Sequence, residues 1–392
     1  MKGHIRKRSK GSWTIWVDLG RDPETGKRKQ QTLTVRGSKA SAERELRAVL
    51  TRIEGGAYVK PTRMTVGEYL ESWLRDYVST NTAPNTADGY SDIVRAHLIP
   101  ELGRFPLSAL QPSHIQAYYS RMLRCGRQDG KGGLSAQTVK HHHRVLYEVL
   151  KHAVKHGVLI RNVAEAVDPP RPDGKEIATL EPDDVRLLLD AARETPYYTL
   201  FYTAIFTGLR RSELLGLRWR DVDLDLATLS VVQTLHYVPK KGYTFREPKT
   251  KRSRRSVDLS PSLAILLREH RANQELERKL LGRLLMPDDL VFSYPDGTPL
   301  PPNSVTKAFH KLAQSLGLSN IRLHDLRHTH ATLMLRQGVH PKVISERLGH
   351  SSVAITLDTY SHVLPGIQAA AAQRFDEGLQ RTREEASARE LG

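Results

Sequence analysis

The fold and chemistry of this chain are decided by two short motifs and one tyrosine near its carboxyl end. They are LHDLRHTH at residues 323–330, LGH at residues 348–350, and Tyr360, which follows Thr359. Together they supply imidazoles, a guanidinium and a phenol, the groups that can hold a phosphodiester and attack it with an oxygen nucleophile without a metal. The sequence therefore predicts a phosphoryl-transfer site with Tyr360 as its nucleophile.

The spacing of His324 and Arg327 predicts an anion clamp. Residues three apart share one face of a helix, and the amide dipoles at a helix start also favour an anion. A capping histidine beside a surface arginine is the alternative for this fragment alone. His324 and His328 have the HxxxH spacing of some zinc sites, but no Glu follows His324 and Arg327 would repel the ion. We therefore expect no metal.

A second guanidinium stands in the motif TGLRRSE at residues 207–213, between a glycine break and a Leu-rich helix. A bidentate guanidinium suits a phosphoryl group, and two of them match the charge of a pentavalent transition state. We expect Arg210 to complete the clamp, with Glu213 pairing to hold it or its neighbours. A capped helix with surface arginines is the alternative.

The run PKTKRSRR at residues 248–255 is strongly basic. Its simplest interpretation is nonspecific phosphate binding, which would include Lys251 and Arg254, or a nuclear import signal. A more specific one is a lysine brought to the leaving oxygen, since an ammonium group can donate the proton that a 5′-alkoxide needs.

Charge and composition limit the partners. The chain has 392 residues and a net charge of +17, which favours a polyanion such as nucleic acid or an anionic membrane surface. Residues 1–60 alone hold 15 Lys or Arg against six Asp or Glu, a concentration that favours nucleic acid. No apolar run reaches the length of a membrane span. A single cysteine, Cys125, excludes an intramolecular disulfide and fits a reducing cytosol.

The length predicts two or three domains, and we expect three. The elements predicted along the chain make it a multidomain, mainly α protein. Residues 1–60 read as a small three-stranded β-sheet plus one helix, because residues 12–20 and 31–35 alternate as strands and residues 42–53 carry a helical stripe. The hairpin tip carries Lys27, Arg28 and Lys29. We expect this tip to contact DNA, the alternative being a solvated basic hairpin.

Residues 61–167 read as a helical domain. Thr65 and Glu68 form a capping box, and helices are predicted at residues 86–98, 112–124 and 137–156. Their bases Arg121, Arg124, Lys140 and Arg144 are expected to contact DNA. A metal site at residues 141–143, three consecutive histidines, is disfavoured because adjacent helical residues point about 100° apart.

Residues 168–176 are rich in proline and read as a linker. The domain predicted at residues 177–365 is mainly α, with helices from residue 182 and at residues 197–207, 261–285, 303–316 and 325–337. Residues 228–232 and 256–259 add a small antiparallel sheet, with a loop around residues 240–242. The tail, residues 366–392, has helical spacing. It docks on a neighbouring protomer, packs on its own chain, or frays.

Taken together and in this order, the motifs at residues 207–210, 248–250, 324–328, 348–350 and 357–362 resemble those of the tyrosine recombinase, or phage integrase, family. HLIPELG at residues 97–103 is similar to the family's core-binding, SAM-like domain. The first domain is similar to the arm-binding domains of integrases from phages and conjugative elements. The resemblance covers nearly the whole chain.

The resemblance implies a site-specific recombinase that integrates or excises a phage or mobile element. Arg210 and Arg327 would bind the scissile phosphate, Lys249 or the nearby Lys251 would be the general acid, His324 would assist proton transfer, and His350 would hydrogen-bond the phosphate. Tyr360 would form a 3′-phosphotyrosyl bond, which keeps the bond energy, so no cofactor is needed.

The implied partners are double-stranded DNA with core-type and arm-type sites, three further protomers at a Holliday junction, and an accessory DNA-bending or directionality protein. The implied location is the bacterial cytoplasm, at the nucleoid. A type IB topoisomerase and a regulator with a dead active site are the alternatives.

Overall fold

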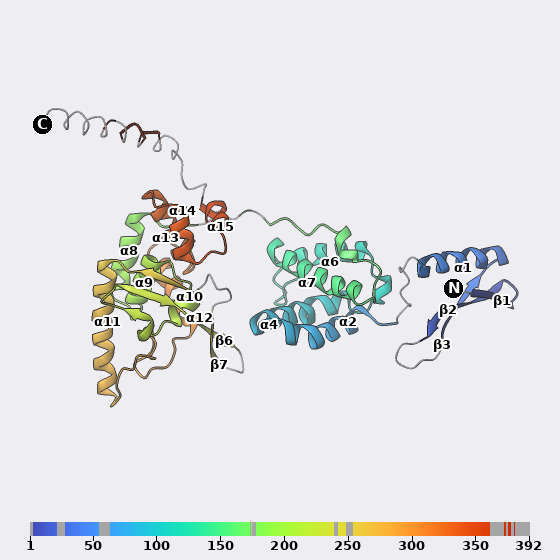
Figure 1. The fold of residues 1–392 in the computed structure, drawn as a ribbon, viewed down its shortest axis with the longest axis horizontal. Coiled ribbons are helices and arrows are strands. Elements are labelled where there is room, and N and C mark those ends of the chain that lie inside the picture. Colours follow the sequence, from blue (N-terminus) through green and yellow to red (C-terminus); the bar gives the residue numbers. More distant parts are fainter. Residues whose placement is uncertain are drawn as a thin grey trace. The chain divides into compact units, whose positions relative to one another are not determined.

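The computed structural model describes residues 3–21, 28–54, 63–172, 174, 178–238, 242–247 and 254–360, with short stretches at 372–373, 375–377 and 380. Two compact units make up the chain, Met1–Gly174 and Lys175–Gly392 (Figure 1). The described residues are mainly helical with small antiparallel sheets, as the sequence predicts. Among them, no helix is both long enough and apolar enough to cross a membrane.

A three-stranded antiparallel sheet and one helix begin the first unit. The strands are β1 (Gly3–Ser9), β2 (Ser12–Arg21) and β3 (Arg28–Arg36), in the order β1-β2-β3, and the helix is α1 (Lys39–Glu54). Ile15 and Val17 of β2 pack against Ala42 and Val49 of α1. The alternation that predicts β2 therefore marks the face that α1 covers. Lys27 and the side chains of Arg28 and Lys29 lie outside the described residues.

The rest of the first unit is helical. Its α-helices are α2 (Val66–Trp73), α3 (Ser79–Asn81), α4 (Pro84–Ile93), α5 (Ile99–Leu102), α6 (Pro112–Cys125) and α7 (Ala136–Lys155). The predicted capping box is confirmed: the Thr65 amide donates to Glu68 Oε2 at 2.7 Å, and the Glu68 amide donates to Thr65 Oγ1 at 3.2 Å. The predicted helix at residues 86–98 is confirmed: it consists of α4 and a π-helical turn, Val94–Leu98, that continues it.

The three consecutive histidines of α7 point in different directions, as their helical spacing requires. His141 is exposed, His142 lies in the core with Nδ1 2.7 Å from the Tyr118 hydroxyl, and His143 lies 2.7 Å from the Tyr119 hydroxyl. Burial lowers the pKa of His142 to about 4, with smaller effects from the charges of neighbouring histidines. His142 is therefore a neutral core residue at physiological pH.

The neutral state of His142 makes this unit acid-sensitive. Because its pKa is lower in the folded than in the unfolded chain, the unfolded chain takes up the proton first, so stability falls as the pH drops from about 6.5 toward 4. The shift corresponds to about 3 kcal/mol. We predict that His142→Asn, which keeps a polar atom near Nδ1, loses less hydrogen-exchange protection in α7 across this range. His156→Asn, at an exposed histidine, should behave as the wild type, and equal losses in both variants would contradict the assignment.

Six of the eight helices described in the second unit, α8 to α13, contribute to one shared apolar core beside two small sheets (Figure 1). The helices are α8 (Pro182–Ala192), α9 (Tyr198–Thr207), α10 (Arg211–Leu215), α11 (Pro261–Leu280), α12 (Pro302–Ser315), α13 (Asp325–Arg336), α14 (Pro341–Leu348) and α15 (Val353–Tyr360). One sheet has the order β4-β5-β8 (Val222–Asp223, Thr228–Val231, Arg255–Asp258), and the other is the hairpin β6-β7 (Thr234–Val238, Gly242–Arg246).

The structure adds two strands and shortens one helix relative to the sequence prediction. Strands β6 and β7, which were not predicted, pair on either side of the predicted loop around residues 240–242, so the basic run follows a hairpin strand. Helix α11 ends at Leu280 rather than at residue 285, because Gly282 takes a left-handed conformation, with φ +70°, and the Arg283 amide bonds back to the Arg278 carbonyl.

Helices α13, α14 and α15 share a small apolar cluster of their own. Its buried members are Ala331, Leu335, Ile344, Leu348 and Tyr360. The sequence analysis did not predict α14 or α15, although Pro341 begins α14 and Gly349, with φ +67°, ends it. This cluster fixes the ring of Tyr360 beside the helix that carries His324 and Arg327.

Candidate catalytic site

The glycine break before Arg210 allows a close approach between distant segments. Gly208 ends α9 in a left-handed conformation, with φ +66°. A Cβ atom there would lie 2.6 Å from Leu348 Cδ2 and 2.8 Å from His330 Cδ2. A larger residue would therefore push α13 and α14 away from Arg210, which begins the next helix.

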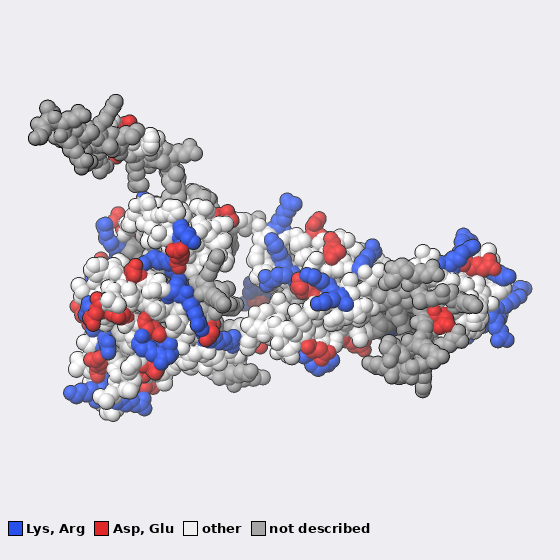
Figure 2. All heavy atoms as spheres, viewed as in Figure 1, with Lys and Arg blue, Asp and Glu red and all other residues white. Residues whose placement is uncertain are grey.

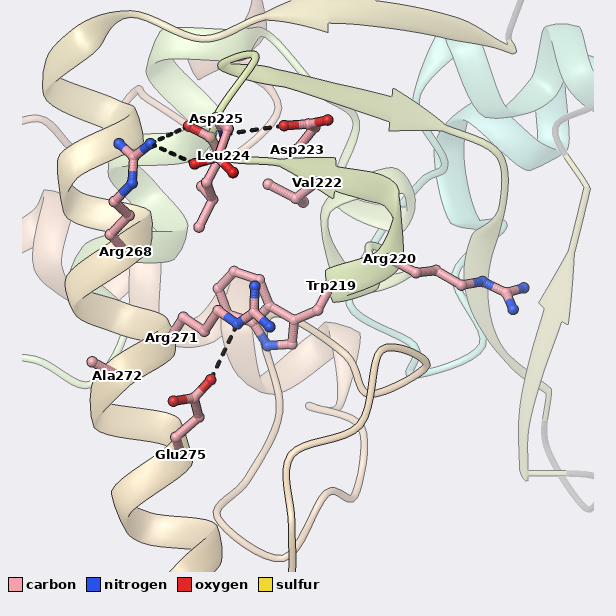
Figure 3. A pocket seen from close by; sticks show the side chains of 10 residues that line it. All are labelled: Trp219, Arg220, Val222, Asp223, Leu224, Asp225, Arg268, Arg271, Ala272 and Glu275. Atoms are coloured by element: carbon pink, nitrogen blue, oxygen red, sulfur yellow. Dashed lines mark hydrogen bonds and ion pairs between the residues drawn. The ribbon is translucent and has the colours of Figure 1, made fainter.

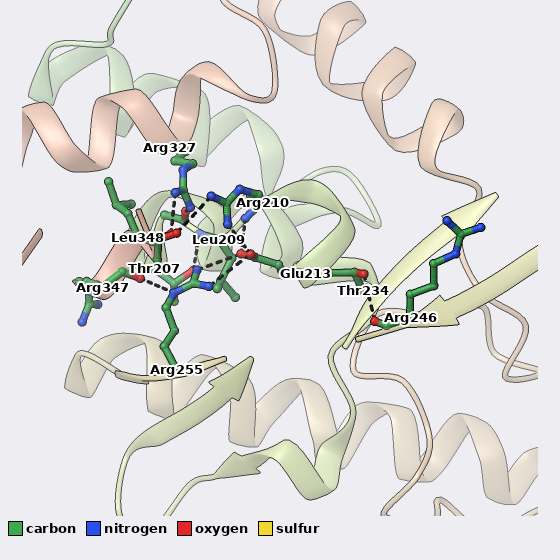
Figure 4. Close-up of polar contacts among 12 residues, drawn as sticks. Thr207, Leu209, Arg210, Glu213, Thr234, Arg246, Arg255, Arg327, Arg347 and Leu348 are labelled. Atoms are coloured by element: carbon green, nitrogen blue, oxygen red, sulfur yellow. Dashed lines mark hydrogen bonds and ion pairs between the residues drawn. The ribbon is translucent and has the colours of Figure 1, made fainter. Parts of the chain in front are cut away.

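Glu213 is the buried carboxylate of the site. Its Oε1 accepts from Arg210 Nη1 at 2.7 Å, and Arg255 donates from Nη1 to Oε1 at 3.2 Å and from Nη2 to Oε2 at 2.9 Å (Figure 4). The Glu213 side chain is 2% exposed and that of Arg255 is 6% exposed. Burial alone would raise the pKa of Glu213, but the hydrogen bonds and charges of Arg255 and then Arg210 outweigh it and lower the pKa. Glu213 is therefore ionised.

Arg255 links this carboxylate to the turn that carries His350. Its Nε donates to the Arg347 carbonyl at 2.6 Å (Figure 4). The sequence analysis treated the basic run as a surface feature and missed this residue. The alternation of a strand could have predicted its burial, because Arg255 and the buried Val257 lie two residues apart in β8 and share a face.

Arg327 is held by two backbone carbonyls. Nη1 donates to Gly208 O at 2.8 Å and Nη2 donates to Leu348 O at 2.6 Å, while Arg210 Nη2 reaches the next carbonyl, Gly349 O, at 3.4 Å. Burial, followed by the positive charge of Arg210, lowers the pKa of Arg327 to about 9. Adjacent carbonyls thus hold two guanidinium groups near each other, and their mutual repulsion favours binding of an anion.

His324 and His350 flank the two guanidinium groups as neutral imidazoles. Burial and then the charge of Arg327 lower the pKa of both, that of His350 to about 4. His350 Nδ1 lies 2.8 Å from Thr356 Oγ1 of α15. At neutral pH, either ring is able to donate one hydrogen bond to an anion.

Tyr360, the last residue of α15, is the remaining member of the catalytic group. Its side chain is 1% exposed, and its hydroxyl lies 2.8 Å from His328 Nδ1. Burial raises the pKa of Tyr360 to about 12, against a smaller lowering effect of Arg327. The phenol is therefore protonated in this DNA-free state. The sequence analysis considered His328 only as a zinc ligand and missed this contact.

The structure thus brings together six of the residues selected from the sequence, from three separate segments. They are Arg210, Glu213, His324, Arg327, His350 and Tyr360. Lys249 and Lys251 lie outside the described residues. Among the described residues, no group of three His, Cys, Asp or Glu side chains is arranged to hold a metal ion.

Comparison with known proteins decides the family. Residues 178–366 match the phage integrase family, and residues 65–123 match the family's N-terminal SAM-like domain. A XerC-like tyrosine recombinase from Caldanaerobacter subterraneus subsp. tengcongensis is 31% identical over 382 residues, which cover 93% of this chain and 95% of that protein. The chain belongs to the phage integrase family. It is accordingly a site-specific DNA recombinase. Membership of this family favours DNA strand exchange over the two alternatives, a type IB topoisomerase and a non-catalytic regulator.

Other integrases are also similar to this chain in sequence or in fold. The ICEBs1 integrase of Bacillus subtilis is 27% identical over 377 residues, covering 96% of this chain and all of the relative. The Tn1549 transposon integrase in complex with transposon right end DNA superposes with a TM-score of 0.67 at 23% identity, over 79% of this chain and 99% of that one. A lambda integrase dimer bound to a core site gives a TM-score of 0.55 at 19% identity, over 91% and 93%. These two structures share the fold.

Basic side chains proposed from the sequence to contact DNA lie on α6 and α7. Arg124, Lys140 and Arg144 are exposed, and the half-buried Arg121 pairs with Glu101 at 2.7 Å. Figure 2 shows Lys and Arg side chains on the face of this helical part that it presents. In the second unit, the exposed Arg254 pairs with Glu247 at 2.5 Å.

A separate pocket of about 500 Å³ lies along α11 beside Trp219 (Figure 3). Four of its charged side chains pair with one another: Arg268 contacts Asp225 at 3.5 Å, and Arg271 contacts Glu275 at 3.2 Å. None of the candidate catalytic residues in the described part of the chain lines it. The pocket is therefore not part of the catalytic site.

The buried charge pair gives a stability prediction. Glu213→Gln leaves the guanidinium of Arg255 buried beside a neutral amide, a change that typically costs about 3–5 kcal/mol. We expect this loss in the free energy of local unfolding, measured by hydrogen exchange in β8. Glu247→Gln removes an exposed partner of Arg254, so it should cost less than about 1 kcal/mol. Equal costs for the two variants would contradict the role given to Glu213.

Proposed function

We propose that this recombinase is an integrase that cuts and rejoins DNA strands through a covalent bond between Tyr360 and a 3′-phosphate. The observation that carries the proposal is the convergence of Arg210, Arg327 and Tyr360 from segments far apart in the sequence. Arg327 bonds to carbonyls of the two segments that flank it, and Tyr360 packs on the same helix. Such a group suits a phosphodiester because its two guanidinium groups, Arg210 and Arg327, outnumber the one carboxylate that pairs with them, Glu213.

The two guanidinium groups hold the scissile phosphate. Arg210 remains 36% exposed, although it pairs with Glu213, so it is able to reach a ligand. Arg327 is buried and fixed, which makes it a preorganised donor that needs little rearrangement when charge develops on phosphorus. His324 and His350, which are neutral at pH 7, donate further hydrogen bonds to the phosphate oxygens.

The reaction exchanges one phosphodiester for another. The Tyr360 oxygen attacks phosphorus, the bond from phosphorus to the 5′-oxygen breaks, and the 5′-alkoxide takes a proton from Lys249, or from Lys251 on the same run. The phenolic proton passes to solvent water as the new bond forms. A 5′-hydroxyl of another strand then reverses these steps, which returns the proton to Tyr360. Bond energy is conserved in the phosphotyrosine, so neither ATP nor a metal is required.

The assembly extends beyond one chain. We propose that residues 1–60 bind arm-type sites, that residues 61–167 and 177–365 each bind core-type sites, and that four protomers exchange strands at a Holliday junction. A solved lambda integrase tetramer bound to a Holliday junction supports this arrangement by its shared fold. An accessory DNA-bending or directionality protein completes the proposal. The substrate, bacterial DNA carrying a phage or mobile element, places the enzyme in the cytoplasm at the nucleoid.

The role of Tyr360 is tested by removing one oxygen atom. Tyr360→Phe keeps the ring in the cluster of α13, α14 and α15, so DNA binding should stay within about threefold of the wild type. Without the nucleophile, no covalent adduct should form on a nicked suicide substrate, as judged by an SDS-resistant protein–DNA band. An adduct formed by this variant would overturn the assignment.

The independence from metal is tested by chelation. Because Arg210 and Arg327 supply the positive charge that a metal nuclease takes from its ion, we expect the wild type to form the adduct at an unchanged rate in excess EDTA. The measurement is the rate of adduct formation with and without the chelator. Complete inhibition that added Mg²⁺ reverses would instead indicate metal-assisted cleavage.

A further inference from the structure

We propose that His328 is a positioning residue for the nucleophile: its imidazole holds the hydroxyl of Tyr360 at the start of the attack on phosphorus. The proposal rests on the proposed role of Tyr360. It follows from the hydrogen bond of 2.8 Å between His328 Nδ1 and Tyr360 Oη, which joins the first turn of α13 to the last residue of α15.

The ring of Tyr360 is fixed by apolar contacts, whereas its reacting oxygen is held by a polar one. The ring belongs to the buried cluster with Ala331, Leu335, Ile344 and Leu348. The rings of His328 and Tyr360 are tilted by 56°, with centroids 5.7 Å apart. Packing of the ring leaves the hydroxyl free to rotate about its C–O bond, so the contact with His328 sets where its proton points.

His328 is itself held next to the phosphate end of the site. It lies one helical turn after His324, on the same face of α13, and the two rings meet edge to face with centroids 5.1 Å apart. His324 also limits where the His328 ring can turn. Helix α13 thus carries both Arg327, which binds the phosphate, and His328, which holds the nucleophile. Residues on one rigid helix keep their relative positions more accurately than residues on two loops.

The protonation states favour a positioning role over that of a general base. Burial, followed by the repulsion that a protonated His324 would exert, lowers the pKa of His328 to about 4, whereas burial raises that of Tyr360 to about 12. Transfer of the phenolic proton to this imidazole is therefore strongly unfavourable in the DNA-free protein. We place the ring proton on Nε2, so that Nδ1 accepts from the phenol and the lone pairs of the oxygen remain for phosphorus.

A matched pair of amides tests the inference. Asn at position 328 places a hydrogen-bond acceptor near the site of Nδ1, whereas Gln carries the same amide one carbon farther out. We expect His328→Asn to form the adduct within about fivefold of the wild-type rate. His328→Gln and His328→Ala should be slower by about 100-fold, the effect of a misplaced reacting group. The rates are measured in single turnover on the nicked substrate at saturating protein.

Several readouts separate positioning from other roles. DNA affinity and melting temperature should match the wild type in His328→Asn and His328→Gln, and His310→Asn, at an exposed histidine of α12, should leave the rate unchanged. Equal rates for His328→Asn and His328→Gln would overturn the inference, as would a wild-type rate for His328→Ala. An adduct formed by Tyr360→Phe would instead overturn the proposed function itself.

Discussion

Glu213 is a carboxylate buried between Arg210 and Arg255, and the rest of the catalytic group depends on this ion pair. A buried charge is costly unless it is paired and hydrogen-bonded, and here every oxygen of the carboxylate has a guanidinium partner. Through Arg255, the same carboxylate is connected to the carbonyl of Arg347, two residues before the turn that carries Gly349 and His350. The pair therefore fixes the second guanidinium and the histidine turn together.

With one carboxylate among several guanidinium groups, the site keeps a surplus of positive charge. The lowered pKa of Arg327 reflects this surplus together with burial. A phosphodiester would supply the missing negative charge, so the same repulsion that costs stability in the DNA-free protein favours substrate binding. The phenol of Tyr360 is kept buried and protonated in that state, which fits an enzyme whose nucleophile acts only after DNA has bound.

The sequence predicted much of this arrangement, and the misses have physical causes. His324 and Arg327 were found because residues three apart share one face of a helix start. Arg210 was found because it stands between a glycine break and a Leu-rich helix, and Glu213 was expected to pair with it or its neighbours. Arg255 was missed because a run of bases usually faces solvent, and only the pairing of β8 shows that this one is buried. The contact of His328 with Tyr360 joins two helices, and no local pattern reports how α15 packs against α13. For hairpin β6-β7, the sequence analysis predicted only the loop around residues 240–242 and missed the strands on either side of it.

The central claim is that these segments close around one phosphate with Tyr360 as the attacking group. The most direct measurement is mass spectrometry of the peptide that stays attached to a nicked suicide substrate after digestion of protein and DNA. We expect a nucleotide linked through its 3′-phosphate to the peptide that contains Tyr360. A nucleotide linked to another residue, or through a 5′-phosphate, would contradict the account.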